Sequence, residues 1–115
     1  RWNMLNPTEP QRRTWVEECL DGRQGPAVAA TDYIRAYADQ IRPYVSGRYV
    51  VLGTDGFGRS DYRVALRRFF EVDRYHVAVA ALKALADEGA VEPSVVASAI
   101  ERYEIDTEPV PPWKR

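Results

Sequence analysis

The stretch YVVLGTDGFGRSD, residues 49–61, decides the fold of this chain. Its first four residues, Tyr49–Leu52, are aromatic, β-branched or aliphatic, which is typical of a buried strand, and Gly53 ends the run. The glycine-rich loop that follows leads to Ser60 and Asp61, either of which can cap a helix. The stretch therefore predicts a strand that passes through a tight loop into a helix.

A second short apolar run precedes this stretch. Residues Ala27–Ala30 follow the turn signal Gly25-Pro26 and are short enough for a buried strand. Between the two runs, Thr31 or Asp32 can cap a helix beginning near Tyr33. The apolar residues of that helix recur at helical spacing: Ile34, Tyr37, Ala38 and Ile41. Strand, helix and strand within residues 25–59 predict a βαβ unit with parallel strands and a right-handed crossover.

The N-terminal residues 1–24 predict a lead-in loop and one short helix. Thr14 and Glu17 have the spacing of a capping box, in which each side chain bonds the backbone amide of the other residue. We expect the helix that they begin to stop near Asp21 and Gly22.

Residues 60–105 predict three further helices. The first leaves Arg63, Arg67 and Arg68 for solvent and has one apolar face: Tyr62, Ala65, Leu66, Phe69 and Phe70. The second, Tyr75–Asp87, is apolar nearly all round, as a helix packed on two sides would be. Gly89 is expected to end it.

Ser94 is expected to cap the third of these helices. Its predicted apolar face is Val95, Val96, Ala99, Ile100 and Tyr103. The tail, residues 106–115, contains three prolines and is expected to be irregular.

Composition is that of a globular protein and excludes several classes of partner. The chain is 45% hydrophobic, and its 16 basic and 17 acidic side chains are mixed along it for a net charge of −1. No basic stripe or basic amphipathic helix favours binding to nucleic acid or to a membrane surface. The single cysteine, Cys19, has no internal disulfide partner and favours a reducing, cytoplasmic compartment.

The predicted elements do not add up to a complete domain. Two strands alone leave unpaired backbone groups along both edges of their sheet. The apolar helix over residues 75–87 also needs more surface to pack against than the chain supplies. Together with a start at Arg1 instead of a methionine, these features indicate that residues 1–115 are a single segment of a larger domain.

Five stretches of the chain carry a family resemblance: RWNMLNP (1–7), GPAVAATDY (25–33), VLGTDGFGRSD (51–61), FEVD (70–73) and the apolar helix over 77–86. In this order they resemble the C-terminal domain of homodimeric bacterial pyruvate dehydrogenase E1 components, a thiamine-diphosphate-dependent family of the transketolase-like superfamily. Asn6 departs from the family pattern, in which histidine is frequent. The resemblance implies an α/β fold, the C-terminal part of a three-layer α/β/α domain with a mostly parallel sheet, here incomplete.

The resemblance also implies what the parent protein does. It would decarboxylate pyruvate with thiamine diphosphate and Mg²⁺, then reductively acetylate the lipoyl group of the acyltransferase component (E2). The implied partners of this segment are the remaining domains of its own chain, the second subunit of a homodimer, and E2. The location implied is the cytoplasm.

The cofactor is expected to lie outside this segment. The family holds Mg²⁺ and the diphosphate with a G-D-G sequence followed downstream by paired asparagines. The only asparagines here, Asn3 and Asn6, lie upstream of the loop G-T-D-G at residues 53–56. We therefore expect no catalytic, cofactor-binding or metal-binding residue in this chain, and an inactive segment when it is isolated.

The loop and its exit supply the structural and interface candidates: Asp55, Gly56, Phe57, Gly58, Arg59, Ser60 and Asp61. A phosphate-binding interpretation competes with a structural one. However, the spacing G-x-x-G-x-G is not the dinucleotide fingerprint, and no P-loop lysine follows. The structural interpretation is a tight turn that places an aromatic ring in a core or an interface.

In that turn, Gly56 and Gly58 are expected to supply a positive φ or a close backbone approach. Asp55 and Asp61 are expected to pair with Arg59 or Arg63, or to reach across a subunit boundary.

The remaining polar residues have structural interpretations. His76 is the only histidine and begins an apolar helix, and Ser60 has no histidine base near it in the sequence. Two other functions stay open. One is an independent binding or regulatory module with a ligand at the loop Gly53–Gly58. The other is a transketolase or related enzyme, because that family carries a similar F-G-x-S loop at the same place.

Overall fold

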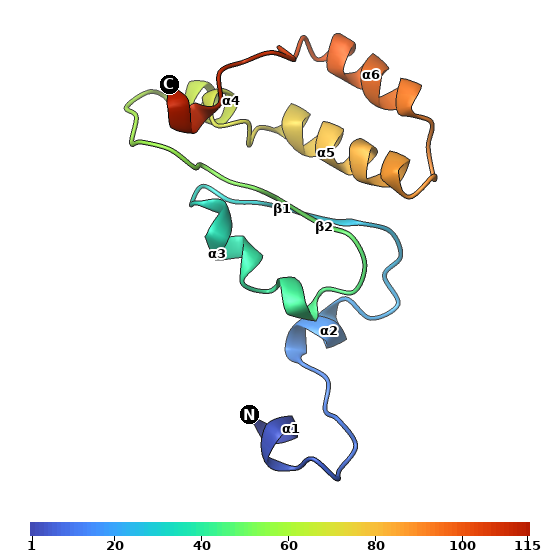
Figure 1. Cartoon of the computed structure of the whole chain (residues 1–115). Helices are drawn as coiled ribbons and strands as arrows, with labels where there is room; N and C mark the ends of the chain where they lie inside the picture. Colours follow the sequence, from blue (N-terminus) through green and yellow to red (C-terminus); the bar gives the residue numbers. More distant parts are fainter.

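The computed structural model describes residues 1–115 and places a small sheet between two helical layers (Figure 1). Its elements follow one another as α1 (Trp2–Leu5), α2 (Trp15–Cys19), β1 (Ala27–Ala30), α3 (Arg35–Asp39), the 3-10 helix η1 (Arg42–Tyr44), β2 (Tyr49–Leu52), α4 (Arg63–Phe69), α5 (Arg74–Asp87), α6 (Pro93–Arg102) and the 3-10 helix η2 (Pro112–Lys114). None of these helices has the length and apolar character that crossing a membrane requires.

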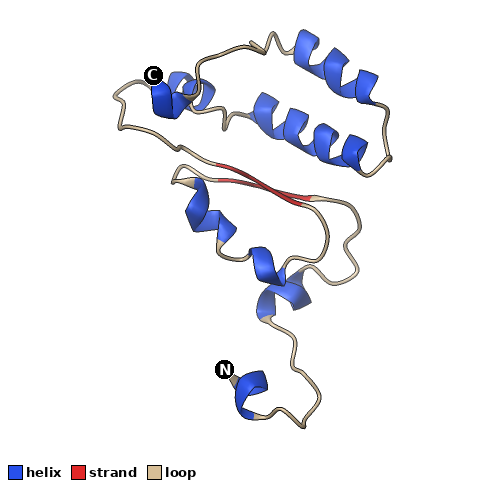
Figure 2. Cartoon of the chain, viewed as in Figure 1, coloured by secondary structure: helices blue, strands red, loops and turns tan.

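The predicted βαβ unit is confirmed. β1 and β2 occupy the residues expected from the sequence and pair in parallel, with Ala27 opposite Tyr49 and Ala30 opposite Leu52. Figure 2 shows α3 and η1 on one side of the two strands and α5 on the other, with α6 beyond α5. The layers are therefore helix, sheet and helix.

The start of α3 differs from the expected one. The N-cap is Ile34, which has no side-chain acceptor, so neither Thr31 nor Asp32 caps the helix. Thr31 accepts a hydrogen bond from the Tyr33 amide instead (3.1 Å), and Asp32 bonds the guanidinium of Arg67 (3.0 Å). Both side chains have other partners, because the helix begins farther along the chain than they can reach.

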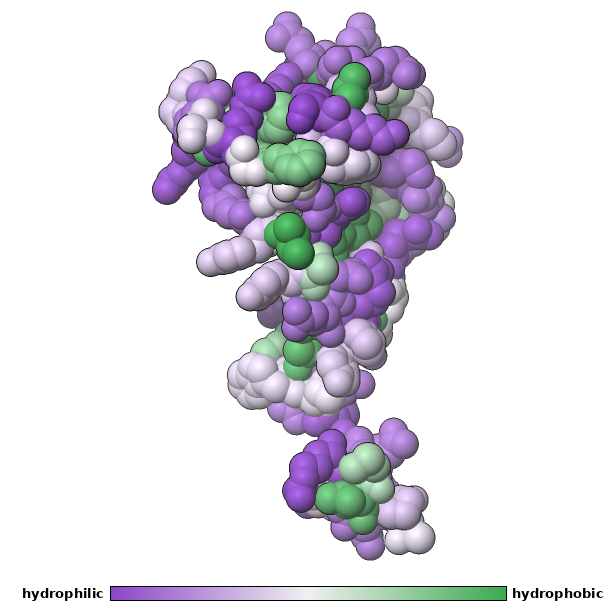
Figure 3. Space-filling model, turned by 60° about the vertical axis from the view of Figure 1, so that its left-hand side comes forward, coloured by the Kyte–Doolittle hydropathy of each residue, from purple (hydrophilic) through white to green (hydrophobic).

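The N-terminal segment follows the prediction at α2, but it also contains α1, where only a loop was expected. Thr14 and Glu17 form the capping box of α2, with the Thr14 hydroxyl accepting from the Glu17 amide (3.3 Å) and the Glu17 carboxylate accepting from the Thr14 amide (2.6 Å). In Figure 3 the N-terminal segment forms a separate lobe with hydrophobic side chains on its surface. Met4 and Leu5 of α1 are both exposed.

The start of α4 also differs from the expected one. Its N-cap is Tyr62, without a side-chain hydrogen bond, so Ser60 and Asp61 do not cap it. Tyr62 is in an extended conformation, and the helix begins one residue later. The Asp61 carboxylate therefore accepts from the amide of its neighbour Tyr62 (2.9 Å) and from no amide of the helix. Tyr62, expected on the apolar face, is 71% exposed, whereas Phe70 is buried.

α5 and α6 form a packed pair over the sheet. Asp73 caps α5 by accepting from the amides of Tyr75 and His76. Gly89, at φ +73°, follows the C-cap of α5 as predicted.

The start of α6 differs from the expected one. Pro93 is its first residue and Glu92 its N-cap, so the expected cap Ser94 lies inside the helix. Proline takes the first helical position because its missing amide would have no partner there.

The core is small and lies between the sheet and helices α4–α6. Only seven of the 115 residues are buried: Tyr49, Phe70, Val72, Ala84, Val96, Ala99 and Pro112. The radius of gyration is 17.3 Å, compared with about 13 Å for a compact domain of this length. The tail, expected to be irregular, contains η2, and its buried residue Pro112 belongs to this core.

Candidate functional site

The loop between β2 and α4, residues 53–62, is fastened at its start by a close backbone approach. A Cβ atom on Gly53 would lie 2.6 Å from the Arg35 amide nitrogen and 2.8 Å from the Tyr33 carbonyl oxygen. The Thr54 amide bonds the same Tyr33 carbonyl (2.9 Å), and its hydroxyl bonds the Asp32 carbonyl (3.0 Å). Glycine is therefore required where β2 ends against the start of α3.

Asp55 joins the loop to α3. Its carboxylate accepts a hydrogen bond of 3.0 Å from the backbone amide of Arg35 and also pairs with the guanidinium of the same residue. The expected pairing of Asp55 with Arg59 or Arg63 is therefore wrong. The reason is topological: both parallel strands end at the same edge of the sheet, so the residues after β2 meet those after β1.

Gly56 and Gly58 have different roles, contrary to expectation. Gly56 has φ +134°, and a Cβ there would lie 3.1 Å from the Pro112 carbonyl oxygen and 3.2 Å from Trp113 Cα. The tail thus packs on the loop at this glycine. Gly58 has no positive φ and open space around its Cβ direction, so nothing in this chain requires glycine there.

The remaining loop residues point outward. Phe57 is 78% exposed, so it does not enter the core of this chain. The guanidinium of Arg59 lies over the Phe69 ring, 4.2 Å from its centroid, and 3.9 Å from the Asp61 carboxylate. The predicted pairing of Asp61 with an arginine is thus confirmed for Arg59, as a surface contact. Ser60 makes no hydrogen bond and caps nothing.

A pocket of about 450 Å³ opens beside the loop. Its walls combine loop residues with the exposed face of α4, and it carries three arginines, Arg59, Arg63 and Arg67, and one carboxylate, Asp32. From the sequence, all three arginines are expected to face solvent or to form surface ion pairs. The three arginines share a pocket because the loop folds back toward α4. No local sequence pattern predicts that path of the loop.

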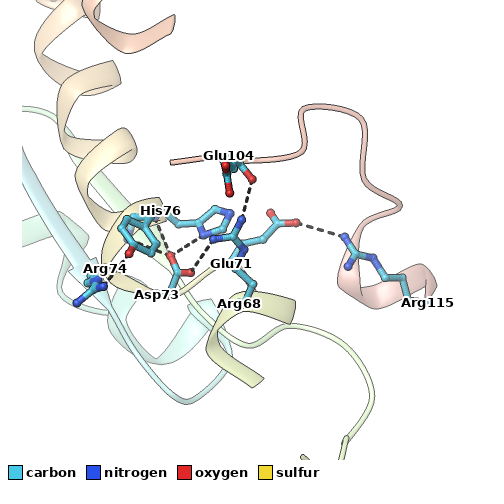
Figure 4. A network of polar contacts seen from close by, with 8 residues as sticks. Arg68, Glu71, Asp73, Arg74, His76, Glu104 and Arg115 are labelled. Atoms are coloured by element: carbon cyan, nitrogen blue, oxygen red, sulfur yellow. Dashed lines mark hydrogen bonds and ion pairs between the residues drawn. The ribbon is translucent and has the colours of Figure 1, made fainter. Parts of the chain in front are cut away.

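A second polar cluster ties α4, α5, the end of α6 and the tail together (Figure 4). Arg68 bonds the Glu104 carbonyl oxygen (2.7 Å) and lies 3.9 Å from the Asp73 carboxylate. His76 Nδ1 lies 2.7 Å from Asp73 Oδ1. Glu71 pairs with Arg115 at 3.5 Å. His76 thus has a structural partner, as expected.

The electrostatics of this cluster are dominated by Asp73. Partial burial raises the pKa of its carboxyl group. Hydrogen bonds from the His76 amide and ring and from the Tyr75 amide outweigh this effect, so the pKa of Asp73 lies below its ordinary value. The carboxylate is therefore held in its charged form as the cap of α5.

The donors needed for a cofactor with a divalent cation do not converge in this chain. No three acidic, histidine or cysteine side chains come together in an arrangement that could hold a metal ion. The two asparagines are engaged locally: Asn3 bonds the backbone of Arg12, and Asn6 bonds the Trp2 carbonyl. These side chains do not offer the ligand set of a Mg²⁺ site.

A model of the transketolase-like TK C-terminal domain matches residues 2–73, which include both strands, the glycine loop and α4. The chain belongs to this family. The family and the parallel βαβ unit together confirm the predicted fold class, with the sheet incomplete here.

The chain is also similar to individual curated proteins over nearly all its length. The chain is 61% identical over 109 residues to the pyruvate dehydrogenase E1 component of Pseudomonas aeruginosa, covering 94% of this chain and 12% of that protein. It is 61% identical over 106 residues to the protein of the same name from Cupriavidus necator, covering 92% and 12%. The corresponding Escherichia coli K12 protein is 50% identical over 113 residues, covering 97% and 12%. The resemblance seen in the sequence is thus confirmed, although the chain spans 12% of the length of these relatives.

Proposed function

We propose that this chain is the C-terminal structural and dimer-supporting segment of a pyruvate dehydrogenase E1 component. The observation that carries the proposal is its 61% identity, over nearly all its length, to proteins of that name. The full-length enzyme would act in the cytoplasm. There it would decarboxylate pyruvate with thiamine diphosphate and Mg²⁺ and reductively acetylate the lipoyl group of E2.

The weak core supports a structural role within a larger chain. Seven buried residues bury too little apolar surface to offset the conformational entropy of 115 ordered residues. Large apolar side chains are exposed on the outer side of α3, where Tyr33 and Tyr37 stack with their ring centroids 5.2 Å apart. Covering these surfaces requires protein from outside the segment, which the remaining domains of the parent chain would supply.

The two edges of the sheet differ in a way that indicates where the rest of the sheet would pair. Backbone groups of a parallel strand alternate between its two sides. The Ala27 and Thr31 amides donate to the carbonyls of Arg48 and Leu52, on the β2 side. The backbone groups of Val28 and Ala30 therefore point away from β2. At the outer edge of β2, Arg42 already donates a hydrogen bond of 2.9 Å to the Tyr49 carbonyl. The outer edge of β1 is therefore the favoured place for a further strand of the parent domain.

The glycine loop would contact the second subunit through Phe57. An exposed aromatic ring on a loop fixed by Gly53 and Asp55 resembles the anchors of protein interfaces, where large rigid rings bury much area at little entropic cost. Thiamine diphosphate and Mg²⁺ would be held by the remainder of the parent chain.

Two measurements on the full-length protein test these assignments separately. Pyruvate-dependent reductive acetylation of a lipoyl domain should require thiamine diphosphate and Mg²⁺; its absence would refute the activity. Phe57→Ser should shift sedimentation from dimer toward monomer, whereas Tyr44→Ser, at a half-exposed aromatic residue of η1, should not. A Phe57→Ser protein that is as dimeric as the wild type would refute the interface role.

A further inference from the structure

The pocket beside the glycine loop gathers positive charge from two elements. Arg59 comes from the loop, and Arg63 and Arg67 come from successive turns of α4. Residues four apart share one face of a helix, which brings the two α4 side chains to the same wall. Asp32 is the only carboxylate in the lining, so the pocket has more cationic than anionic groups.

The three arginines are not equally engaged. Arg67 bonds Asp32 at 3.0 Å, and Arg59 is held by Asp61 and the Phe69 ring. Arg63 has no ion pair, hydrogen bond or aromatic partner within the chain, although it lines the same pocket. Its planar guanidinium, with five donors, is thus free for an anion that enters the pocket.

The loop adds unpaired backbone donors. None of the amides of residues 55–61 donates a hydrogen bond within the protein. Gly56, Phe57 and Gly58 belong to this run and line the pocket beside the arginines. Successive free amides in a turn form concave sites for anions. Leu66 and Phe70 supply the apolar floor of the pocket.

We infer that this pocket binds a small phosphorylated ligand, with its phosphate group between Arg63 and the loop amides. The volume of about 450 Å³ lies within the range of roughly 300–1,000 Å³ that is usual for small-molecule sites. Arginine forks match the oxygens of phosphate, and the apolar floor suits the organic part of such a ligand. The proposed subunit contact uses Phe57 of the same lining, but the inference does not require that contact, because it concerns a ligand and not assembly or turnover.

The test is calorimetric titration of the full-length protein with inorganic phosphate at constant ionic strength, with thiamine diphosphate and Mg²⁺ saturating throughout. We expect one phosphate site per chain. Arg63→Gln should weaken its affinity by at least about tenfold, because one charge-assisted fork is lost. The melting temperature should not change, because Arg63 has no partner within the chain. Arg102→Gln, at an exposed arginine of α6 outside the pocket, is the matched control and should bind phosphate as the wild type does.

Each other outcome overturns the inference. No phosphate site, or equal affinity in Arg63→Gln and wild type, would show that the pocket does not bind the group. Citrate binding as tightly as phosphate would show an unselective cationic patch. A change in the monomer–dimer equilibrium of Arg63→Glu, with phosphate binding intact, would assign the arginines to carboxylates of the second subunit.

Discussion

The carboxylate of Asp55 accepts a hydrogen bond of 3.0 Å from the backbone amide of Arg35, which lies 20 residues earlier in the chain. Arg35 is the first residue of α3, and the N-cap Ile34 has no side chain able to accept this bond. A residue after β2 thus performs the capping that residues before a helix usually perform. The same bond fastens the glycine loop to the βαβ unit.

Replacing Asp55 should therefore destabilise the protein through α3. Asp55→Ala leaves the Arg35 amide without its acceptor and should cost about 0.5–2 kcal/mol of unfolding free energy. Asp55→Asn keeps a side-chain oxygen and should cost less than half as much. Denaturant unfolding of the full-length protein measures both. Asp61→Ala, which removes an exposed bond to the neighbouring Tyr62 amide and a surface contact of 3.9 Å with Arg59 but no contact with α3, should change stability by less than about 0.5 kcal/mol. Equal losses for Asp55→Ala and Asp61→Ala would contradict the capping role.

The two loop glycines form a matched pair for the next prediction. Gly56→Val places a β-branched side chain at φ +134° and 3.1 Å from the Pro112 carbonyl, and should cost on the order of 1–3 kcal/mol. Gly58→Val meets neither obstacle and should be nearly neutral. We expect Gly56→Val to lower the melting temperature and the dimer fraction, while turnover per dimer stays near that of the wild type. A fully dimeric, thermally normal Gly56→Val enzyme with a hundredfold lower turnover would instead place the loop at the active site.

The sequence predicted the elements well and their side-chain partners poorly, and the reason lies in sequence distance. The strands β1 and β2 and the Thr14–Glu17 capping box depend on neighbouring residues, and the structure contains all three. Asp55 instead bonds a residue 20 positions away, and the contact of Gly56 with Pro112 spans half the chain. Such contacts depend on which strand ends meet, so nearest-neighbour reasoning assigned Asp55 to the wrong arginines.

The capping residues illustrate a second limit. Ser94 has good N-cap chemistry, but Pro93 fixes the start of α6 one residue earlier and leaves Ser94 within the helix. Likewise, Asp61 precedes α4 by one residue too many to cap it. Phe57 could be assigned from the sequence to a core or an interface; its exposure of 78% excludes only the core of this chain.

Two glutamates occupy a helix-ending position that normally favours glycine, which allows a stabilising substitution. Glu104 follows the C-cap of α6 at φ +51°, where its amide bonds the Glu101 carbonyl and the next amide bonds the Ile100 carbonyl. Its partner Arg68 bonds only its backbone carbonyl. Glu104→Gly should therefore relieve backbone strain and raise the unfolding free energy by about 0.5–1 kcal/mol.

The control for this substitution is Glu101→Gly. Glu101 is exposed inside α6, where glycine should cost about 1 kcal/mol relative to a good helix former. Thermal unfolding of the two variants should thus shift in opposite directions. Glu71, at φ +60°, is less suitable, because its side chain also pairs with Arg115. If both variants lowered the melting temperature, positive φ at Glu104 would not be a source of strain.

The lowered pKa of Asp73 makes its contribution to stability depend on pH in a defined direction. A carboxyl group whose pKa is lower in the folded than in the unfolded state stabilises the fold at pH values above its unfolded pKa, and this stability is lost as pH falls through the folded pKa. Asp73→Asn removes the charge but keeps an acceptor for the amides of Tyr75 and His76. The difference in unfolding free energy between wild type and Asp73→Asn should therefore be greatest near neutral pH. It should shrink as pH falls below 3.8, the ordinary pKa of this carboxyl group.

Asp106→Asn, at an exposed carboxylate that bonds only the Glu108 amide, is the control and should show a much smaller change over the same range. A wild-type advantage over Asp73→Asn that persists unchanged in acid would mean that the charge of Asp73 does not contribute to capping α5.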